Sequence, residues 1–242
     1  MLEELCLLSG NDIPFLAATI NVHPPTIHEI AFIGEKNFFI GCQLLNISKE
    51  LLKEEDKMSL TDKDNFDILM SIVCSEDENS QQICALMVLS LIFPLHNPSF
   101  ELDGIHLDNE TEHIVIGKEI FPEFQNILVQ IFCLNEAKSN DYKPKNEAAK
   151  RIAEKLKKGR EKAEVAKGHD TNKIAVFSRY VSILAIGLQM DLKVLFSHTV
   201  YQLYDEFKRF QLNHSFGIDL QARMAGATDL DEIDNWMDDI HQ

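Results

Sequence analysis

An abrupt change of composition at Asn135 constrains the fold of this chain more than any other feature. Residues 138–170 are rich in Lys, Glu and Ala, and their apolar stripe is thin and interrupted by a glycine. This composition is typical of an exposed helix or of a partly helical linker. The sequence therefore predicts an α+β domain at residues 1–136, a charged helical linker at residues 137–170 and an all-α domain at residues 171–242.

The N-terminal part is predicted to be mostly helical, with a small β element. Apolar residues recur at helical spacing over much of residues 24–134. Near the start, Thr26 is placed to cap a short helix and Gly34 to end it. The period changes between residues 99 and 117, where apolar alternation predicts a β-hairpin with its turn at residues 108–110.

The C-terminal part is predicted to contain helices only. One very apolar helix starts near Thr171, a second near Asp191 and a third near Thr199. A separate short helix is expected at residues 217–226. Thr228 is placed to cap a last helix with an apolar face. The fold class is therefore α+β and mostly helical, with an all-α C-terminal module.

Composition and charge narrow the class of protein. Apolar residues make up 45% of the 242 residues, enough for a sizeable core. The net charge of -16 argues against general binding to nucleic acid or anionic lipid, because both favour a surplus of Lys and Arg. The apolar run from Ile83 to Leu95 is too short to span a bilayer, and the N-terminus lacks the basic region of a secretory signal. We expect a cytoplasmic protein with no membrane partner.

No arrangement of residues predicts chemistry. The five cysteines form no CxxC pair, so they are expected to be buried free thiols. His106 and His113 flank the predicted hairpin turn and can approach each other, but no cysteine or carboxylate frames them as a zinc site. We therefore expect surface histidines. The chain also has no phosphate-binding loop and no GxSxG elbow. No catalytic residue, cofactor or metal is predicted, and the chain is not expected to be an enzyme.

The last quarter of the chain is the candidate protein-binding region, because it concentrates aromatic residues and acids in short helices. The aromatic stripe near residues 201–210 is wide; such a stripe more often belongs to a core, yet part of it can stay exposed for a partner. Most of the candidate residues would act as apolar anchors, and one arginine would make a charged contact. The residues expected to bind a partner are Tyr201, Tyr204, Phe207, Arg209, Phe210, Trp236 and Met237.

Three segments resemble proteins encoded in the tail gene clusters of phages that infect Gram-positive bacteria. The first is PPTIHEIAFIGEKNFF at residues 24–39, and the second is FSRYVSILAIGLQMDL at residues 177–192. The third is TVYQLYDEFKRFQLNHSFGIDLQARMAGATDLDEIDNWMDDIH at residues 199–241. With these segments, the chain looks like a tail assembly chaperone-type protein encoded near the tape measure protein.

This resemblance implies a protein that binds the long helical tape measure protein, or another tail component, before the tail tube polymerises around it. It places the chain in the host cell cytoplasm or in the virion tail. Self-association into a homo-oligomer is a further partner expectation. One alternative is a structural tail or baseplate protein that remains in the virion. Another is a nucleic-acid-associated regulator that uses the basic segment 143–173, although interleaved glutamates dilute its charge.

Overall fold

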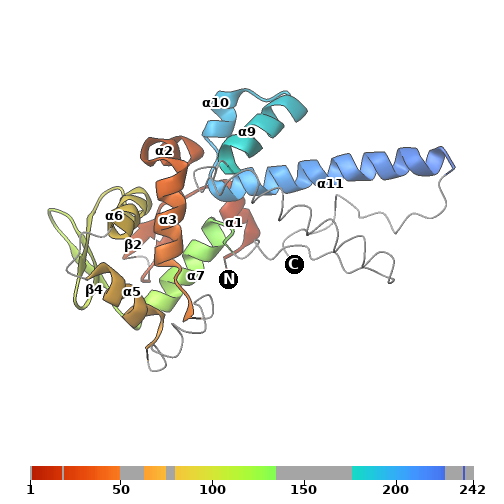
Figure 1. The fold of residues 1–242 in the computed structure, drawn as a ribbon. Helices are drawn as coiled ribbons and strands as arrows, with labels where there is room; N and C mark the ends of the chain where they lie inside the picture. The colour runs from red at the N-terminus through yellow and green to blue at the C-terminus, as the bar shows by residue number, and fades with distance from the viewer. Residues whose placement is uncertain are drawn as a thin grey trace, which may run out of the picture.

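The computed structural model describes residues 2–17, 19–49, 63–74, 80–134, 176–226 and 237. It confirms a mostly helical α+β fold with two small antiparallel sheets (Figure 1). The predicted linker at residues 137–170 and the predicted helix starts at Thr171 and Thr228 lie outside the described residues. The elements in chain order are α1 (Glu4–Ser9), β1 (Ile13–Phe15), β2 (Ile20–Val22), α2 (Ile27–Ile33), α3 (Glu35–Leu45), α5 (Asn65–Val73), α6 (Ser80–Ile92), β3 (Asn97–Glu101), β4 (Gly104–Asp108), β5 (His113–Ile116), α7 (Phe121–Ile131), α9 (Val176–Gly187), α10 (Leu192–Phe196) and α11 (Val200–Met224).

Helix α2 begins and ends where the sequence predicts. The Thr26 side chain accepts a hydrogen bond from the Glu29 amide, and the Glu29 carboxylate accepts one from the Thr26 amide. This capping box satisfies two groups that a helix N-terminus would otherwise leave unpaired. Gly34 ends the helix with a φ of 84°, a value that glycine adopts at little cost. Helix α3 starts at the next residue.

Helices α3 and α6 form the closest helix pair of the N-terminal part. A Cβ atom added to Gly41 of α3 would lie 2.4 Å from the Cys84 carbonyl oxygen and 2.6 Å from Cγ2 of Val88, both on α6. No larger side chain fits between the two backbones without moving them. The glycine therefore permits the contact that buries the apolar face of α6.

The structure has one more strand and one more turn than the β-hairpin predicted at residues 99–117. Strands β3, β4 and β5 form a three-stranded antiparallel meander, with an extra turn at residues 102–103. The apolar side chains of Ile105, Leu107 and Ile116 are fully buried on one face of this sheet. The sequence hid the extra turn because Leu102 continues the apolar alternation, yet its side chain is 90% exposed.

The C-terminal helices pack on the N-terminal part and share its core. The Phe177 amide of α9 donates a hydrogen bond of 2.6 Å to the Glu35 carboxylate of α3. An isolated antiparallel β-bridge pairs Thr26 with Thr199. The buried residues of both parts, including Phe38, Phe124 and Leu203, belong to one hydrophobic cluster. The described parts of the two predicted domains thus meet in a common core, while the predicted linker lies outside the described residues.

Helix α11 is the longest element that the structure describes, and it differs from the prediction of two separate helices. It runs without a break from Val200 to Met224, through Gly217. Its first turns are buried against the fold, and its second half extends away from the other described helices (Figure 1). A glycine in a helix interior costs only about 0.5–1 kcal/mol, so it does not end a helix by itself. Among the described residues, no helix combines the length and apolar character needed to cross a membrane.

Candidate functional site

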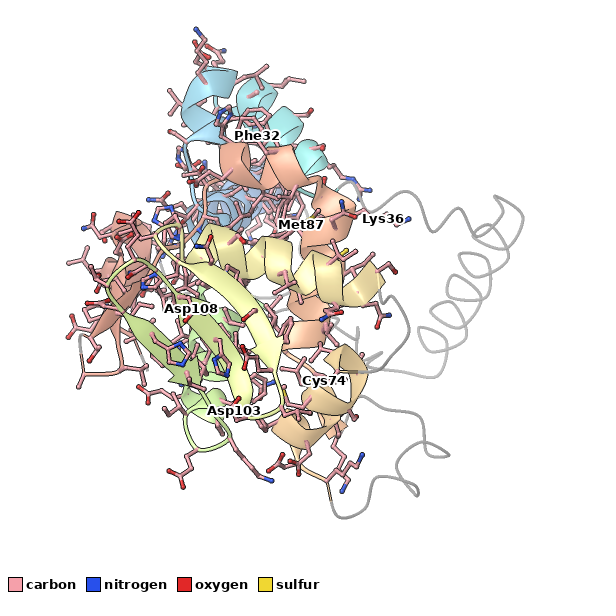
Figure 2. The ribbon with its side chains drawn as sticks, turned by 90° about the vertical axis from the view of Figure 1, so that its left-hand side faces the viewer. Phe32, Lys36, Cys74, Met87, Asp103 and Asp108 are labelled. Carbon is pink, nitrogen blue, oxygen red and sulfur yellow. The ribbon has the colours of Figure 1, made fainter. Side chains whose placement is uncertain are left out.

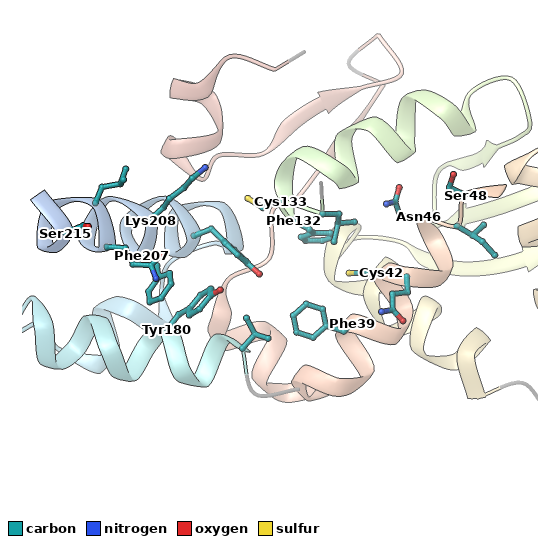
Figure 3. A pocket seen from close by; sticks show the side chains of 17 residues that line it. Phe39, Cys42, Asn46, Ser48, Phe132, Cys133, Tyr180, Phe207, Lys208 and Ser215 are labelled. Atoms are coloured by element: carbon teal, nitrogen blue, oxygen red, sulfur yellow. The ribbon is translucent and has the colours of Figure 1, made fainter. Parts of the chain in front are cut away.

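A groove of about 1160 Å³ lies between α11, α9, the C-terminal half of α3 and the end of α7 (Figure 3). Most of the described side chains that line it are apolar, and Lys208 is the one charged residue among these. The two residues that border the undescribed range 135–175 are both part of the lining. The full set is Phe39, Cys42, Gln43, Asn46, Ile47, Ser48, Phe132, Cys133, Leu134, Val176, Tyr180, Tyr204, Phe207, Lys208, Gln211, Leu212 and Ser215.

Packed aromatic rings form the wall of the groove between α9 and α11. The rings of Tyr180 and Phe207 are stacked, with centroids 3.8 Å apart and planes 14° apart. The Tyr204 ring meets Tyr180 edge-on at 5.2 Å. Nearer α3, Phe39 stacks on Phe177 at 5.0 Å. Because aromatic pairs of this kind contribute about 0.5–1.5 kcal/mol beyond burial, the wall is a rigid apolar surface.

The capping box at Thr199 fixes where α11 begins. The Thr199 side chain accepts a hydrogen bond from the Gln202 amide, and the Gln202 side chain accepts one from the Thr199 amide. From this start, positions 204, 208, 211 and 215 fall on one face at helical spacing. All four line the groove. The opposite face at this level carries Asn213, which is exposed.

The structure separates the predicted aromatic binding residues into three environments. Tyr201 is 6% exposed and belongs to the core, which places it where a partner cannot reach it without rearrangement. Tyr204 and Phe207 line the groove. Phe210 is half-buried outside the groove, and its ring packs so closely on Gly187 that a Cβ atom there would lie 2.5 Å away.

The remaining predicted binding residues are not gathered at the groove. Arg209 pairs with the Asp205 carboxylate one turn earlier in α11, at 3.8 Å. Met237 is 67% exposed. Trp236 lies outside the described residues, as does the basic segment 143–173. The predicted set is therefore brought together only in part, through Tyr204 and Phe207.

Sequence reasoning missed the groove residues that come from other elements. Phe39 and Tyr180 are about 140 positions apart, and the aromatic pair Phe38-Phe39 was the only local signal of an aromatic cluster in α3. Lys208 and Ser215 were not singled out because they are ordinary surface residues on a helical wheel. Only the packing of α9 and α11 against α3 shows that these residues share one surface.

Burial keeps the Cys42 thiol at the groove from being an activated nucleophile. Cys42 is fully buried, and burial raises its pKa well above the ordinary value for a thiol. A protonated thiol is a poor nucleophile and a poor metal ligand. Cys133 lies at the groove and is half-buried. These two residues act as small apolar side chains of the lining.

Two parts of the expectation for His106 and His113 are wrong: His106 is buried, and a carboxylate lies beside each ring. The two rings do approach each other, with centroids 5.0 Å apart. However, His106 is 4% exposed, and its Nε2 atom lies 2.7 Å from a carboxylate oxygen of Asp103. His113 is paired in the same way with Asp108. Carboxylates therefore lie beside both histidines. The contact of His106 with Asp103 could not be read from the sequence, because the β3–β4 turn was not foreseen.

The comparisons with known proteins concern the C-terminal helices. The family described as YomV second domain matches residues 167–241, which is less than half of the chain. This match includes α9, α10 and α11, and therefore one wall of the groove. It is a phage-associated domain family, so the match is consistent with a phage protein. No curated protein and no solved structure shows significant similarity to the chain.

Proposed function

We propose that the chain is a non-enzymatic binding protein of phage tail assembly, which holds an apolar stripe of a helical partner in the groove beside α11. The partner suggested by the resemblance of residues 199–241 is the tape measure protein. The observation that carries the proposal is the aromatic groove, one wall of which falls inside the segment that matches a phage-associated domain.

The shape and chemistry of the groove suit a helix better than a small polar substrate. Helix-in-groove recognition places apolar anchors, spaced three or four residues apart, into an apolar channel. The groove offers stacked rings as a rigid wall, and Lys208, Gln211 and Ser215 as polar lining residues from α11. Pre-packed aromatic anchors lose little conformational entropy when a partner binds. A partner helix can therefore gain affinity mainly from apolar burial.

Charge supports a partner that is not strongly acidic. The chain has a net charge of -16, so its long-range field repels acidic proteins and attracts basic ones. Among the described residues that line the groove, there is one lysine and no carboxylate. An amphipathic helix with an apolar stripe and basic flanks fits both properties. Such a helix, free in the cytoplasm before tube assembly, would expose the stripe to aggregation.

The test is co-expression with the long helical protein encoded beside this chain, followed by affinity pull-down and size-exclusion chromatography. Leu212→Asp is the blocking variant, because Leu212 lines the groove, is half-buried and lies outside the hydrophobic core. Asn213→Asp is the matched control on the opposite face of α11. We expect co-elution of the partner with the wild type and with Asn213→Asp. Capture by Leu212→Asp should weaken more than about tenfold, as a lost anchor at the centre of an interface does.

Two outcomes would contradict the proposal. If both variants capture the partner as well as the wild type, the groove is not the binding surface. If the partner stays insoluble and the wild type elutes alone, tape-measure binding is wrong. The second candidate, a structural tail or baseplate protein, would then be tested by looking for the chain in purified mature particles. Equal melting temperatures of the two variants show that a binding defect is not a folding defect.

A further inference from the structure

We propose that two copies of this chain associate through α11, so that residues 211–224 of each copy lie antiparallel in the groove of the other. These residues are called the protruding half of α11 below. The association uses the groove of the proposed function but does not rest on the identity of any other partner. Only its regulatory consequence, given last, rests on the proposed function.

The protruding half of α11 has exposed apolar side chains and extends away from the other described helices (Figure 1). Helix α9 ends beside Phe210, whose ring packs on Gly187, and α11 continues from there to Met224. It leaves the molecule on the side opposite the β3–β4–β5 sheet, which faces the viewer in Figure 2. The side chains of Ile218, Leu220 and Met224 are 53%, 44% and 82% exposed. Apolar side chains gathered on an exposed surface are typical of a protein–protein interface.

The local sequence of the protruding half gives little intrinsic support to a helix. Residues 213–217 read NHSFG, and all five residue types rank below Ala, Leu, Glu and Lys in helix propensity. A helix of this length is marginal by itself in water, because helices in proteins gain most of their stability from the packing of one face. The groove of a second copy would supply such a packing surface.

One face of α11 continues from the groove into the protruding half. The groove-lining positions 204, 208, 211 and 215 are spaced by three or four residues, and the same spacing leads on to Ile218 and Asp219. Along α11 the groove extends over about 17 Å and the protruding half over about 20 Å, at about 1.5 Å per residue. The protruding half of a second copy therefore fits the groove in length.

Charge complementarity favours a second copy as the occupant and an antiparallel direction. Lys208 is the one charged residue among the described residues that line the groove. Asp219 is the one acidic residue of the protruding half, and it lies about three helical turns after Lys208 on the same face. With a two-fold axis between positions 213 and 214, Lys208 of each copy is level with Asp219 of the other, and this ion pair occurs twice. A parallel, in-register pair would place like charges opposite each other instead.

The same register brings apolar side chains together. Ile218 of one copy is level with the turn between Phe207 and Gln211 of the other. The Phe207 ring is held there by its stacking on Tyr180 of α9. An exposed side chain in this position enters the space between two residues four apart, as a knob enters a hole in a helix pair. Leu212, which lines the groove, lies next to the two-fold axis and is covered in both copies.

The test is sedimentation velocity of the full chain alone over a range of concentrations. The test variants are Lys208→Glu and Asp219→Lys, each of which places like charges opposite each other in both ion pairs. We expect a reversible monomer–dimer equilibrium in the wild type and an association constant lowered more than about tenfold in each variant. Gln221→Lys, exposed on the opposite face of α11, is the matched control for added positive charge and should dimerise as the wild type does. Unchanged melting temperatures show that the variants are folded.

An equimolar mixture of Lys208→Glu and Asp219→Lys tests the register directly. In the mixed dimer the introduced glutamate of one copy faces the introduced lysine of the other, and the second ion pair is the native one. We therefore expect the mixture to form a dimer that neither variant forms alone. A wild type that is monomeric at every concentration, dimers that persist in both variants, or a mixture that stays monomeric would each overturn the proposal.

Under the proposed function, the dimer competes with the helical partner for the groove. A groove that is occupied in most copies lowers the apparent affinity for the partner by the fraction that is free. Asp219→Lys should therefore capture the tape measure protein at a lower concentration than the wild type does. The sedimentation experiment needs no partner, so a monomeric wild type would overturn the dimer and leave the proposed function standing. Failure of every variant to capture the partner would do the reverse.

Discussion

Replacing Gly41 with alanine should destabilise the protein, although alanine is the better helix former. The new Cβ atom would lie 2.4 Å from the Cys84 carbonyl oxygen, so α3 and α6 must separate by about 1 Å to restore an ordinary contact. Overpacking of this kind costs about 1–3 kcal/mol, and the gain in helix propensity returns about 0.5–1 kcal/mol. The obstacle is a backbone carbonyl that cannot rotate aside, so the cost should be about 3 kcal/mol, the upper end of this range, and the net loss about 2 kcal/mol.

Gly217→Ala is the matched control, because nothing lies within 4 Å of a Cβ atom at this position in α11. That change should stabilise the protein by about 0.5–1 kcal/mol. The assay is urea unfolding followed by far-ultraviolet circular dichroism, supported by thermal melts, in which 1 kcal/mol corresponds to about 2–4 °C. If Gly41→Ala is as stable as the wild type, or if both variants gain equally, the close α3–α6 contact is wrong.

Two further predictions concern single buried side chains. Hydrogen bonding to Glu206 raises the pKa of His198 above its ordinary 6.5, so His198 stabilises the fold fully below about pH 6.5, and this contribution is lost as pH rises through the folded-state pKa. The free energy of unfolding, measured with urea between about pH 5 and about pH 9, should fall with rising pH in the wild type and change less in His198→Asn. Identical pH profiles for the two proteins would contradict this prediction. Gln125→Leu should cost about 1–3 kcal/mol, since the amide donates to the carbonyl oxygens of Leu45 and Ile47, both at 3.1 Å. An unchanged urea midpoint for Gln125→Leu would contradict this prediction and show that water takes over the hydrogen bonds of the lost amide.

The helices of the N-terminal part were predictable because their signals are local. Within the predicted helical range 24–134, the apolar residues at helical spacing form the buried faces of α6 and α7. The Thr26 cap and the Gly34 stop also depend only on nearby backbone groups. By contrast, the hairpin β1–β2 was not foreseen, because two three-residue strands give no readable period.

The sites were less predictable because they combine residues that are distant in sequence. Of the predicted binding residues, Tyr204 and Phe207 line the groove and Tyr201 is buried, although all three share one helical stripe. The stripe is wide enough to face two neighbours, and only the position of α9 divides it between core and groove. The partner role of these residues remains a prediction for the capture experiment.

The sequence alone determined where most helices form, because caps and apolar spacing act within a few residues. Tertiary structure decided what the helices do for one another. Packing of α9 and α11 against α3 created the groove, and the extra strand of the meander brought Asp103 to His106. Helix α11 continues through Gly217, because the small free-energy cost of a glycine is outweighed by the hydrogen bonds of an unbroken helix. Contacts between residues distant in the chain depend on how whole elements pack, and a local pattern contains no information on that packing.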